Sequence, residues 1–203
     1  ESARFLDAYR RRLSNSFDRW DLQPIGVAQS GGATRPVTAQ LDQMYVPLRF
    51  AVGYDVGETN RGQYLSPEKL LATKKSIIVR GPAGAGKTTW LRHAFRKMLS
   101  SADVLPIMIV LRDLARRWIS PSCVGEARSI EAVLQCIFEE NVPGSSSKIL
   151  SSLLESDRPQ VVLLVDGWDE VGPLAEELRA KLLGFLRHHP RTFAIVTSRP
   201  YGE

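Results

Sequence analysis

The sequence predicts a three-layer α/β domain, in which helices cover both faces of a mainly parallel sheet, preceded by an N-terminal helical segment. Four apolar runs of strand length lie at residues 76–80, 105–111, 161–166 and 192–197, and helical patterns separate them. Runs that are apolar throughout are typical of parallel strands buried on both faces. Their alternation with helices is typical of this architecture. The length of 203 residues suits one such domain with a flanking segment.

The N-terminal segment is expected to form an amphipathic helix over about residues 3–20. Its apolar side chains recur on one helical face: Phe5, Leu6, Tyr9, Leu13, Phe17 and Trp20. Residues 29–36 are polar and rich in glycine, which predicts a flexible loop. We therefore expect two units, an N-terminal helix and loop over residues 1–40 and a main domain over residues 41–203.

The segment before the first buried strand is less regular. Residues 44–52 are apolar and aromatic, but Pro47 limits them to an edge strand or an extended segment. A loop is expected over residues 53–63. Ser-Pro-Glu at residues 66–68 suits an N-cap, a first helical position and a first-turn acid, so a helix should end near residue 75. Further helices are expected at 87–99, 113–118, 130–140, 147–156 and 174–188.

A glycine-rich loop follows the first of the four apolar runs. It matches G-x-x-x-x-G-K-[ST] at every fixed position and comprises Gly81, Pro82, Ala83, Gly84, Ala85, Gly86, Lys87 and Thr88, with Thr89 next in the helix. Glycines allow successive backbone N–H groups to converge on phosphate oxygens. The following helix directs its positive end at the same anion. Lys87 would reach the β- and γ-phosphates, and the Thr88 hydroxyl would bind Mg²⁺.

Acidic residues follow the third apolar run. Asp166 ends the strand over residues 161–166, and Asp169 and Glu170 follow after two further residues. An acid at this strand end suits Mg²⁺, and a second acid nearby can orient the attacking water. Asp169 and Glu170 are both candidates for that second role. The structural alternative, an acidic surface turn before the next helix, is disfavoured downstream of a complete phosphate loop.

Arg199 follows the fourth apolar run. A cation at the tip of a strand beside the phosphate loop can contact the γ-phosphate and so distinguish a triphosphate from a diphosphate. The alternative is a surface arginine paired with a nearby acid. The neighbouring motifs favour the functional interpretation.

Composition suggests a cytoplasmic protein. Cys123 and Cys136 have neither metal-site nor disulfide-framework spacing, so free thiols in a reducing compartment are expected. The apolar runs are too short to span a membrane, and the charged N-terminus does not resemble a signal peptide. The net charge of +5 is scattered along the chain. Positive charges dispersed in this way favour an ordinary solvated surface over a single binding patch. Nucleic acid is therefore the less favoured alternative as a partner.

Together these motifs resemble a NACHT domain. The resemblance rests on GPAGAGKTT, LPIMIVLRDLA, LLVDGWDEV and IVTSRP, with YVPLRF at residues 45–50 similar to the family's N-terminal strand segment. It covers about residues 4–200. NACHT domains belong to the STAND class of signalling ATPases, P-loop NTPases that include animal NOD-like receptors and bacterial and fungal immune proteins. The acidic motif is more specific than the loop, because most P-loop families lack its two further acids.

The resemblance implies ATP or ADP with Mg²⁺ as cofactors, and roles that follow the family's motifs: Lys87 for phosphate, Thr88 and Asp166 for Mg²⁺, Asp169 or Glu170 for hydrolysis, and Arg199 as the sensor 1 arginine. Tyr45 and Val46 would line the adenine pocket. Arg112, in LRDL, lies just past a strand end, and a helix-capping surface pair is its expected role. The preference for ATP over GTP comes from the resemblance, since no guanine-specifying N-K-x-D occurs.

The resemblance also implies a molecular switch in innate immunity or antiphage defence, with slow hydrolysis. Exchange of ADP for ATP would open the protein and drive self-association, and effector and sensor domains would lie elsewhere in the parent chain. The sequence would then be a NACHT domain truncated after its sensor arginine, with strand 76–80 left as a sheet edge. A motor or loader ATPase of the AAA+ type is the main alternative, and a non-hydrolysing scaffold is a third.

Overall fold

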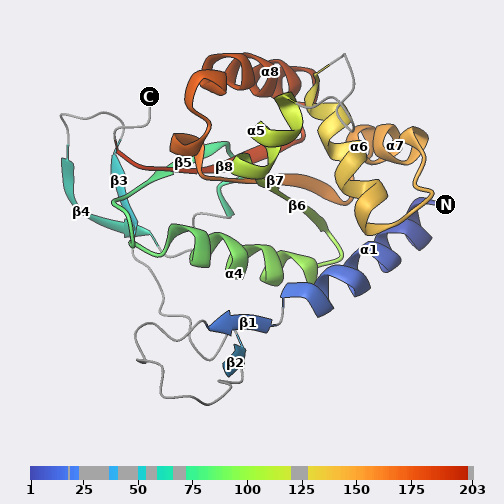
Figure 1. The fold of residues 1–203 in the computed structure, drawn as a ribbon, viewed down its shortest axis with the longest axis horizontal. Helices are drawn as coiled ribbons and strands as arrows, with labels where there is room; N and C mark the ends of the chain where they lie inside the picture. The colour runs from blue at the N-terminus through green and yellow to red at the C-terminus, as the bar shows by residue number, and fades with distance from the viewer. Residues whose placement is uncertain are drawn as a thin grey trace, which may run out of the picture.

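A four-stranded parallel sheet lies at the centre of the fold in the computed structural model, which describes residues 1–17, 19–22, 37–40, 50–53, 59–65, 72–119 and 128–200 (Figure 1). Its strands are β5 (Ile77–Arg80), β6 (Val104–Val110), β7 (Gln160–Asp166) and β8 (Phe193–Ser198). They pair in the order β5-β8-β7-β6, and every pairing is parallel. The predicted α/β architecture is therefore confirmed.

Helices cover both faces of this sheet. Figure 1 shows α4 (Lys87–Leu99) below it and α8 (Ala175–His188) above it. Three more helices follow β6 along the chain: α5 (Leu111–Ile119), α6 (Ile130–Asn141) and α7 (Ser147–Glu155). The middle residues of β7, Val161–Val165, are all buried, as expected for a strand apolar at every position. The four strands are parallel, so their carboxyl ends meet at one edge, where the phosphate loop and the acidic motif also lie.

Two short antiparallel hairpins depart from the expected pattern. β1 (Arg19–Leu22) pairs with β2 (Val37–Gln40), and β3 (Phe50–Gly53) pairs with β4 (Thr59–Leu65). The expected helix thus ends at Phe17, and Trp20 lies in β1. Alternation of Trp20 and Leu22 with polar residues fits a strand as well as a helix. β4 overturns the loop expected over residues 53–63, because a mostly polar strand paired through its backbone shows no hydrophobic pattern. The expected loop at 29–36 and helix start at 66–68 lie outside the described residues.

The N-terminal helix α1 (Ser2–Phe17) is part of the hydrophobic core. Its Phe5 and Tyr9 rings pack against Phe138 of α6, with centroid distances of 4.6 and 5.7 Å. The Tyr9 hydroxyl is buried and donates a hydrogen bond of 3.1 Å to the Pro106 carbonyl in β6. Buried aromatic side chains contribute strongly to core stability. Helix α1 therefore stabilises the sheet at its β6 edge.

Replacing Tyr9 with phenylalanine should change how stability depends on pH. Burial raises the pKa of the Tyr9 phenol well above its ordinary value. The unfolded chain therefore releases this proton first, near pH 10, and wild-type stability should fall as pH rises above about 10. In Tyr9→Phe, we expect a loss of about 1 kcal/mol at neutral pH, from the hydrogen bond, and a smaller alkaline fall. Urea unfolding at pH 7 and pH 10.5 measures both terms, and an unchanged alkaline fall would contradict the assignment.

The cysteine expectation is wrong for Cys136. This residue on α6 takes part in a disulfide bond, and no described cysteine is a free thiol. Disulfide formation depends on proximity in the fold, which the spacing of two cysteines in a sequence does not reveal. Among the described helices, none is long and apolar enough to cross a membrane.

Candidate nucleotide-binding site

The phosphate loop connects β5 to α4, as its position in the sequence predicted. Gly86 occupies the N-cap of α4 with φ +79°, a left-handed conformation that favours glycine. The Lys87 ammonium folds back over the loop and donates hydrogen bonds to the carbonyls of Gly81 (2.6 Å) and Pro82 (2.9 Å). The Gly81 N–H donates to the Ser198 carbonyl of β8 at 3.3 Å. The loop is thereby fixed to the strand that precedes the candidate sensor arginine.

The two predicted Mg²⁺ ligands lie together although 78 positions separate them in sequence. Thr88, in the first turn of α4, donates its hydroxyl proton to Asp166 Oδ1 at 3.2 Å. Asp166 ends β7, in register with Val110 of β6. A hydroxyl and one carboxylate beside a phosphate loop fit Mg²⁺, which is usually bound by one or two carboxylates together with substrate phosphates and water. The structure therefore brings together two oxygen groups of the kind that Mg²⁺ prefers.

Thr197 is a site residue that sequence reasoning missed. Its buried hydroxyl donates to Asp166 Oδ1 at 2.5 Å and accepts a hydrogen bond of 3.0 Å from the Gly167 N–H. Asp166 Oδ1 thus accepts from two hydroxyls, on α4 and on β8. The available signal was a hydroxyl at the end of an otherwise apolar strand, just before Ser198. A buried hydroxyl needs a partner, but the burial of Thr197 is known only from the structure, so this signal was too weak to assign the threonine to the site.

Arg199 and Asp169 form a doubly connected pair. Arg199 Nε lies 2.9 Å from Asp169 Oδ2, and the Arg199 backbone N–H donates to Asp169 Oδ1 at 3.0 Å. The carboxylate is 14% exposed and the arginine side chain 56% exposed. Asp169 therefore fixes both the backbone and the guanidinium of the candidate sensor. The pairing joins the segment after β7 to the segment after β8.

Glu170 pairs with Arg112 instead. Arg112 Nη2 lies 2.8 Å from Glu170 Oε2, so the expected surface pair of Arg112 involves a candidate catalytic acid. Glu170 ends the 3₁₀ turn η1 (Trp168–Glu170), and its side chain folds back over Gly167. A Cβ at Gly167 would lie 3.3 Å from Glu170 Cδ, and its φ is +84°. Glycine is needed here for both the backbone conformation and the close approach of Glu170.

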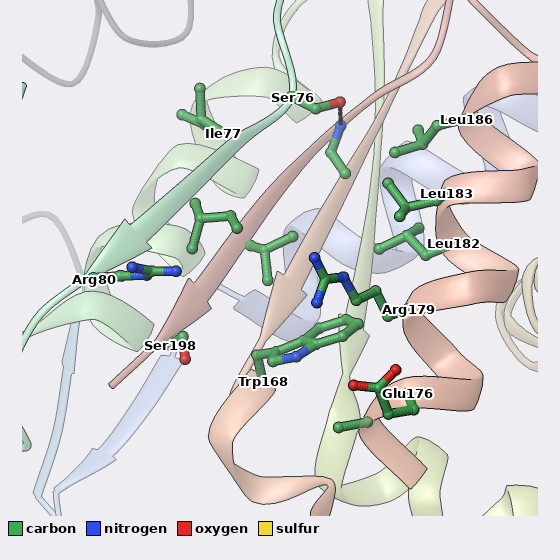
Figure 2. A pocket seen from close by; sticks show the side chains of 14 residues that line it. Ser76, Ile77, Arg80, Trp168, Glu176, Arg179, Leu182, Leu183, Leu186 and Ser198 are labelled. Atoms are coloured by element: carbon green, nitrogen blue, oxygen red, sulfur yellow. Dashed lines mark hydrogen bonds between the residues drawn. The ribbon is translucent and has the colours of Figure 1, made fainter. Parts of the chain in front are cut away.

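Trp168, which lies between Gly167 and these acids in the sequence, has a packing role. It packs against the hydrophobic core and lines a pocket of about 420 Å³ between α8 and strands β5 and β8. Figure 2 shows Trp168 pointing from the end of β7 toward α8. Ser198 and Arg80, the residues before Arg199 and Gly81, line the same pocket. The residues that precede the phosphate loop and Arg199 therefore border the space between the sheet and α8.

Tyr45 and Val46, predicted to line the adenine pocket, lie outside the described residues, so that assignment stays a prediction. The other predicted residues gather at the carboxyl edge of the sheet, in two linked sets. One contains the phosphate loop, Thr88 and Asp166, and the other contains the two arginine–carboxylate pairs. Gly167 connects the two sets, because its N–H donates a hydrogen bond to Thr197 and the Glu170 side chain occupies the space beside it, 3.3 Å from where a Cβ would lie.

The family model for the NACHT domain matches residues 75–203, which is more than half of the chain. The match begins just before β5 and includes the phosphate loop, the acidic motif and the arginine after β8. Helix α1, which shares the core, lies outside the matched residues. No protein of curated function shows significant sequence similarity to the chain.

Proposed function

Because this chain belongs to the NACHT domain family of P-loop NTPases, we propose that it binds ATP and ADP with Mg²⁺, hydrolyses ATP slowly and serves as the nucleotide-dependent module of a signalling switch. The observation that supports this most directly is the 3.2 Å contact between Thr88 and Asp166. It joins the phosphate loop to the acidic strand end, so one bound Mg²⁺ can reach both. When bound, the metal ion would offset the negative charge of the nucleotide's phosphates.

Lys87 and the start of α4 bind the phosphates in this proposal. The ammonium already contacts two loop carbonyls, and a short movement of its flexible stem brings it to a phosphate oxygen. Thr88 and Asp166 hold the metal. Thr197 keeps the carboxylate of Asp166 oriented, since its hydroxyl donates to the same oxygen as Thr88. Fixed ligands reduce the reorganisation required when charge develops during phosphoryl transfer.

Asp169 and Glu170 take different roles. Both oxygens of Asp169 contact Arg199, so we assign Asp169 to positioning the sensor arginine. Glu170 has one contact to an exposed arginine and lies against Gly167, next to the metal acid. We assign Glu170 to orienting the attacking water, a task that needs an available carboxylate oxygen.

Arg199 provides the distinction between ATP and ADP. Its guanidinium is anchored by Asp169 yet more than half exposed, so it can contact a γ-phosphate that only ATP carries. A contact made with one nucleotide and not the other is what biases a two-state protein. We extend the proposal to self-association in the ATP state, effector and sensor domains elsewhere in the parent chain, a cytoplasmic location, and a role in innate immunity or antiphage defence.

The rate of hydrolysis separates this proposal from a motor ATPase of the AAA+ type. A switch is reset by hydrolysis, so the full-length protein should turn over ATP at or below roughly a few per minute. A motor works continuously and should approach the ordinary enzyme rate of about 10 per second. Steady-state phosphate release at saturating MgATP decides between them. A rate near the higher value would exclude the switch.

Two isosteric substitutions test the roles of the acids. In Glu170→Gln, we expect hydrolysis to fall by about 100-fold with ATP affinity retained, because the amide cannot accept a proton from water. In Asp169→Asn, we expect a smaller fall in rate and a weaker preference for ATP over ADP, because Arg199 loses its charged anchor. Single-turnover hydrolysis gives the rate, and calorimetry gives both affinities.

Glu155→Gln is the matched control for these substitutions. Glu155 is an exposed acid on α7, away from the nucleotide site, and its substitution should change neither quantity. Unchanged hydrolysis in both site variants would refute the two assignments.

A further inference from the structure

Arg112 lies at the start of α5, immediately after the edge strand β6. The last residue of β6, Val110, is in register with Asp166, the proposed metal ligand. The chain therefore brings Arg112 to the carboxyl edge of the sheet, one strand away from the metal acid. The resemblance to the NACHT family implied no role for Arg112, and the sequence predicted only a surface ion pair for it.

From this placement we infer that Arg112 is a positioning residue for ATP hydrolysis: it holds the carboxylate of Glu170 toward the metal side of the site. The inference rests on the proposed function, because it requires Glu170 to orient the attacking water. Arg112 acts through Glu170 and does not itself touch the nucleotide. It is thus the counterpart of the Arg199–Asp169 pair, with the roles reversed: there the acid positions the arginine, and here the arginine positions the acid.

Within the part of the chain that the structure describes, Arg112 and Glu170 pair only with each other. Arg112 Nη2 contacts Glu170 Oε2 at 2.8 Å, and neither side chain has another polar partner among the described residues. Glu170 is in a one-turn 3₁₀ segment, where the backbone alone leaves several rotamers open to a glutamate. The ion pair selects one of them, in which the carboxylate lies against Gly167.

Stability alone does not account for this pair. Its side chains are 62% and 32% exposed, and exposed ion pairs contribute little to stability. The effect of the pair on the position of the Glu170 carboxylate can be much larger, because a misplacement of about 1 Å at a catalytic group can slow a reaction on the order of 100-fold. Removing Arg112 should therefore leave the fold intact and reduce the rate of hydrolysis.

The test uses five variants of the full chain: Arg112→Ala, Arg112→Lys, Glu170→Gln, the double variant Arg112→Ala/Glu170→Gln, and the control Arg117→Ala. Arg117 lies on the same helix and pairs with Glu140, so its substitution also removes an arginine–glutamate pair. Single-turnover hydrolysis and calorimetric affinity for MgATP are measured for each, with thermal unfolding as a check on the fold.

We expect Arg112→Ala to slow hydrolysis roughly tenfold or more, with the Kd for MgATP within about twofold of wild type. Arg112→Lys should recover part of the rate, because the ammonium keeps the charge but not the planar fork. The double variant should be no slower than Glu170→Gln alone, since both substitutions remove the same function. Arg117→Ala should behave as wild type.

Three results would overturn the inference. A normal rate in Arg112→Ala, when wild type hydrolyses ATP and Glu170→Gln does not, would show that Glu170 needs no positioning and would leave the proposed function standing. A double variant slowed by the product of the two single effects would show that Arg112 acts independently of Glu170. A loss of MgATP affinity in Arg112→Ala would show direct contact with the phosphates. Absence of hydrolysis in wild type would instead refute the proposed function, and the inference with it.

Discussion

Lys87→Ala is expected to lower the affinity for MgATP by on the order of 100-fold or more. The Lys87 ammonium lies 2.6 and 2.9 Å from two carbonyls of the phosphate loop, so it already contacts the loop that we propose to bind the phosphates. Charge-assisted hydrogen bonds contribute about 1.5–3 kcal/mol each, and the ammonium can donate to both the β- and γ-phosphates. Losing roughly 3 kcal/mol of binding free energy corresponds to about a 150-fold increase in Kd.

Calorimetric titration of the full chain with MgATP measures this change. Lys181→Ala is the matched control, because it removes the same charge from an exposed position on α8. If general electrostatic attraction governs nucleotide binding, the two variants will weaken it equally. If the loop lysine binds the phosphates, only Lys87→Ala will do so. An unchanged Kd in Lys87→Ala, with the fold confirmed by thermal unfolding, would contradict the assignment of the loop.

The fold was predictable where sequence signals are local and strong. The boundaries of α4, 87–99, agree with the prediction, because the phosphate-loop motif marks where this helix begins. The four central strands were found because each is an apolar run, which is typical of strands in a parallel sheet. Burial on both faces holds for β7 and β8, whereas Ile78 of the edge strand β5 is 61% exposed. Strand β4 was missed because its residues are mainly polar and its pairing with β3 uses the backbone. Backbone pairing leaves no pattern in the side chains.

The candidate site was predictable in its parts but not in its connections. The loop, Asp166 and Arg199 were each predicted from a motif at a strand end, and the structure brings them to the same edge of the sheet. The acid that pairs with Arg199 could not be predicted. Asp169 and Glu170 are adjacent in the sequence, and no local rule decides which of them contacts the arginine. Their distinction comes from β6 and β8, which place Arg112 beside one acid and Arg199 beside the other. Strand order is a property of the whole sheet, so it separates two residues that the sequence leaves equivalent.

Thr197 is a second case in which a contact between neighbouring strands could not be predicted from the sequence. A threonine at a strand end is common, and nothing in its neighbours indicates that its hydroxyl reaches Asp166, 31 positions earlier. The contact exists because β7 and β8 are adjacent and parallel. The disulfide of Cys136 was missed for the same reason, since proximity in space is not encoded by spacing. A disulfide is unusual in the reducing cytosol, so the cytoplasmic location remains a proposal.

Asp166→Asn is expected to abolish the effect of Mg²⁺ on hydrolysis and to reduce the rate at saturating ATP by on the order of 100-fold or more. The asparagine side chain is nearly isosteric and keeps an oxygen that can accept from Thr88 and Thr197, as Asp166 Oδ1 does now. What it loses is the negative charge that a hard dication requires. The substitution therefore keeps the hydrogen bonds of residue 166 and removes only its proposed role in binding the metal.

Titrating Mg²⁺ at constant ATP distinguishes the two parts. In wild type, Mg²⁺ should strengthen ATP binding and allow hydrolysis, because a metal ion held by Asp166 and Thr88 would offset the charge of the phosphates. In Asp166→Asn, the affinity for ATP without Mg²⁺ should stay within about twofold of wild type, because Lys87 and the loop are intact. Asp103→Asn is the control, since Asp103 pairs with Arg158 near the amino ends of the strands. If Asp166→Asn retained the full Mg²⁺ dependence, the metal would be held by other residues, and the geometry around Asp166 would serve only to join β7, β8 and α4.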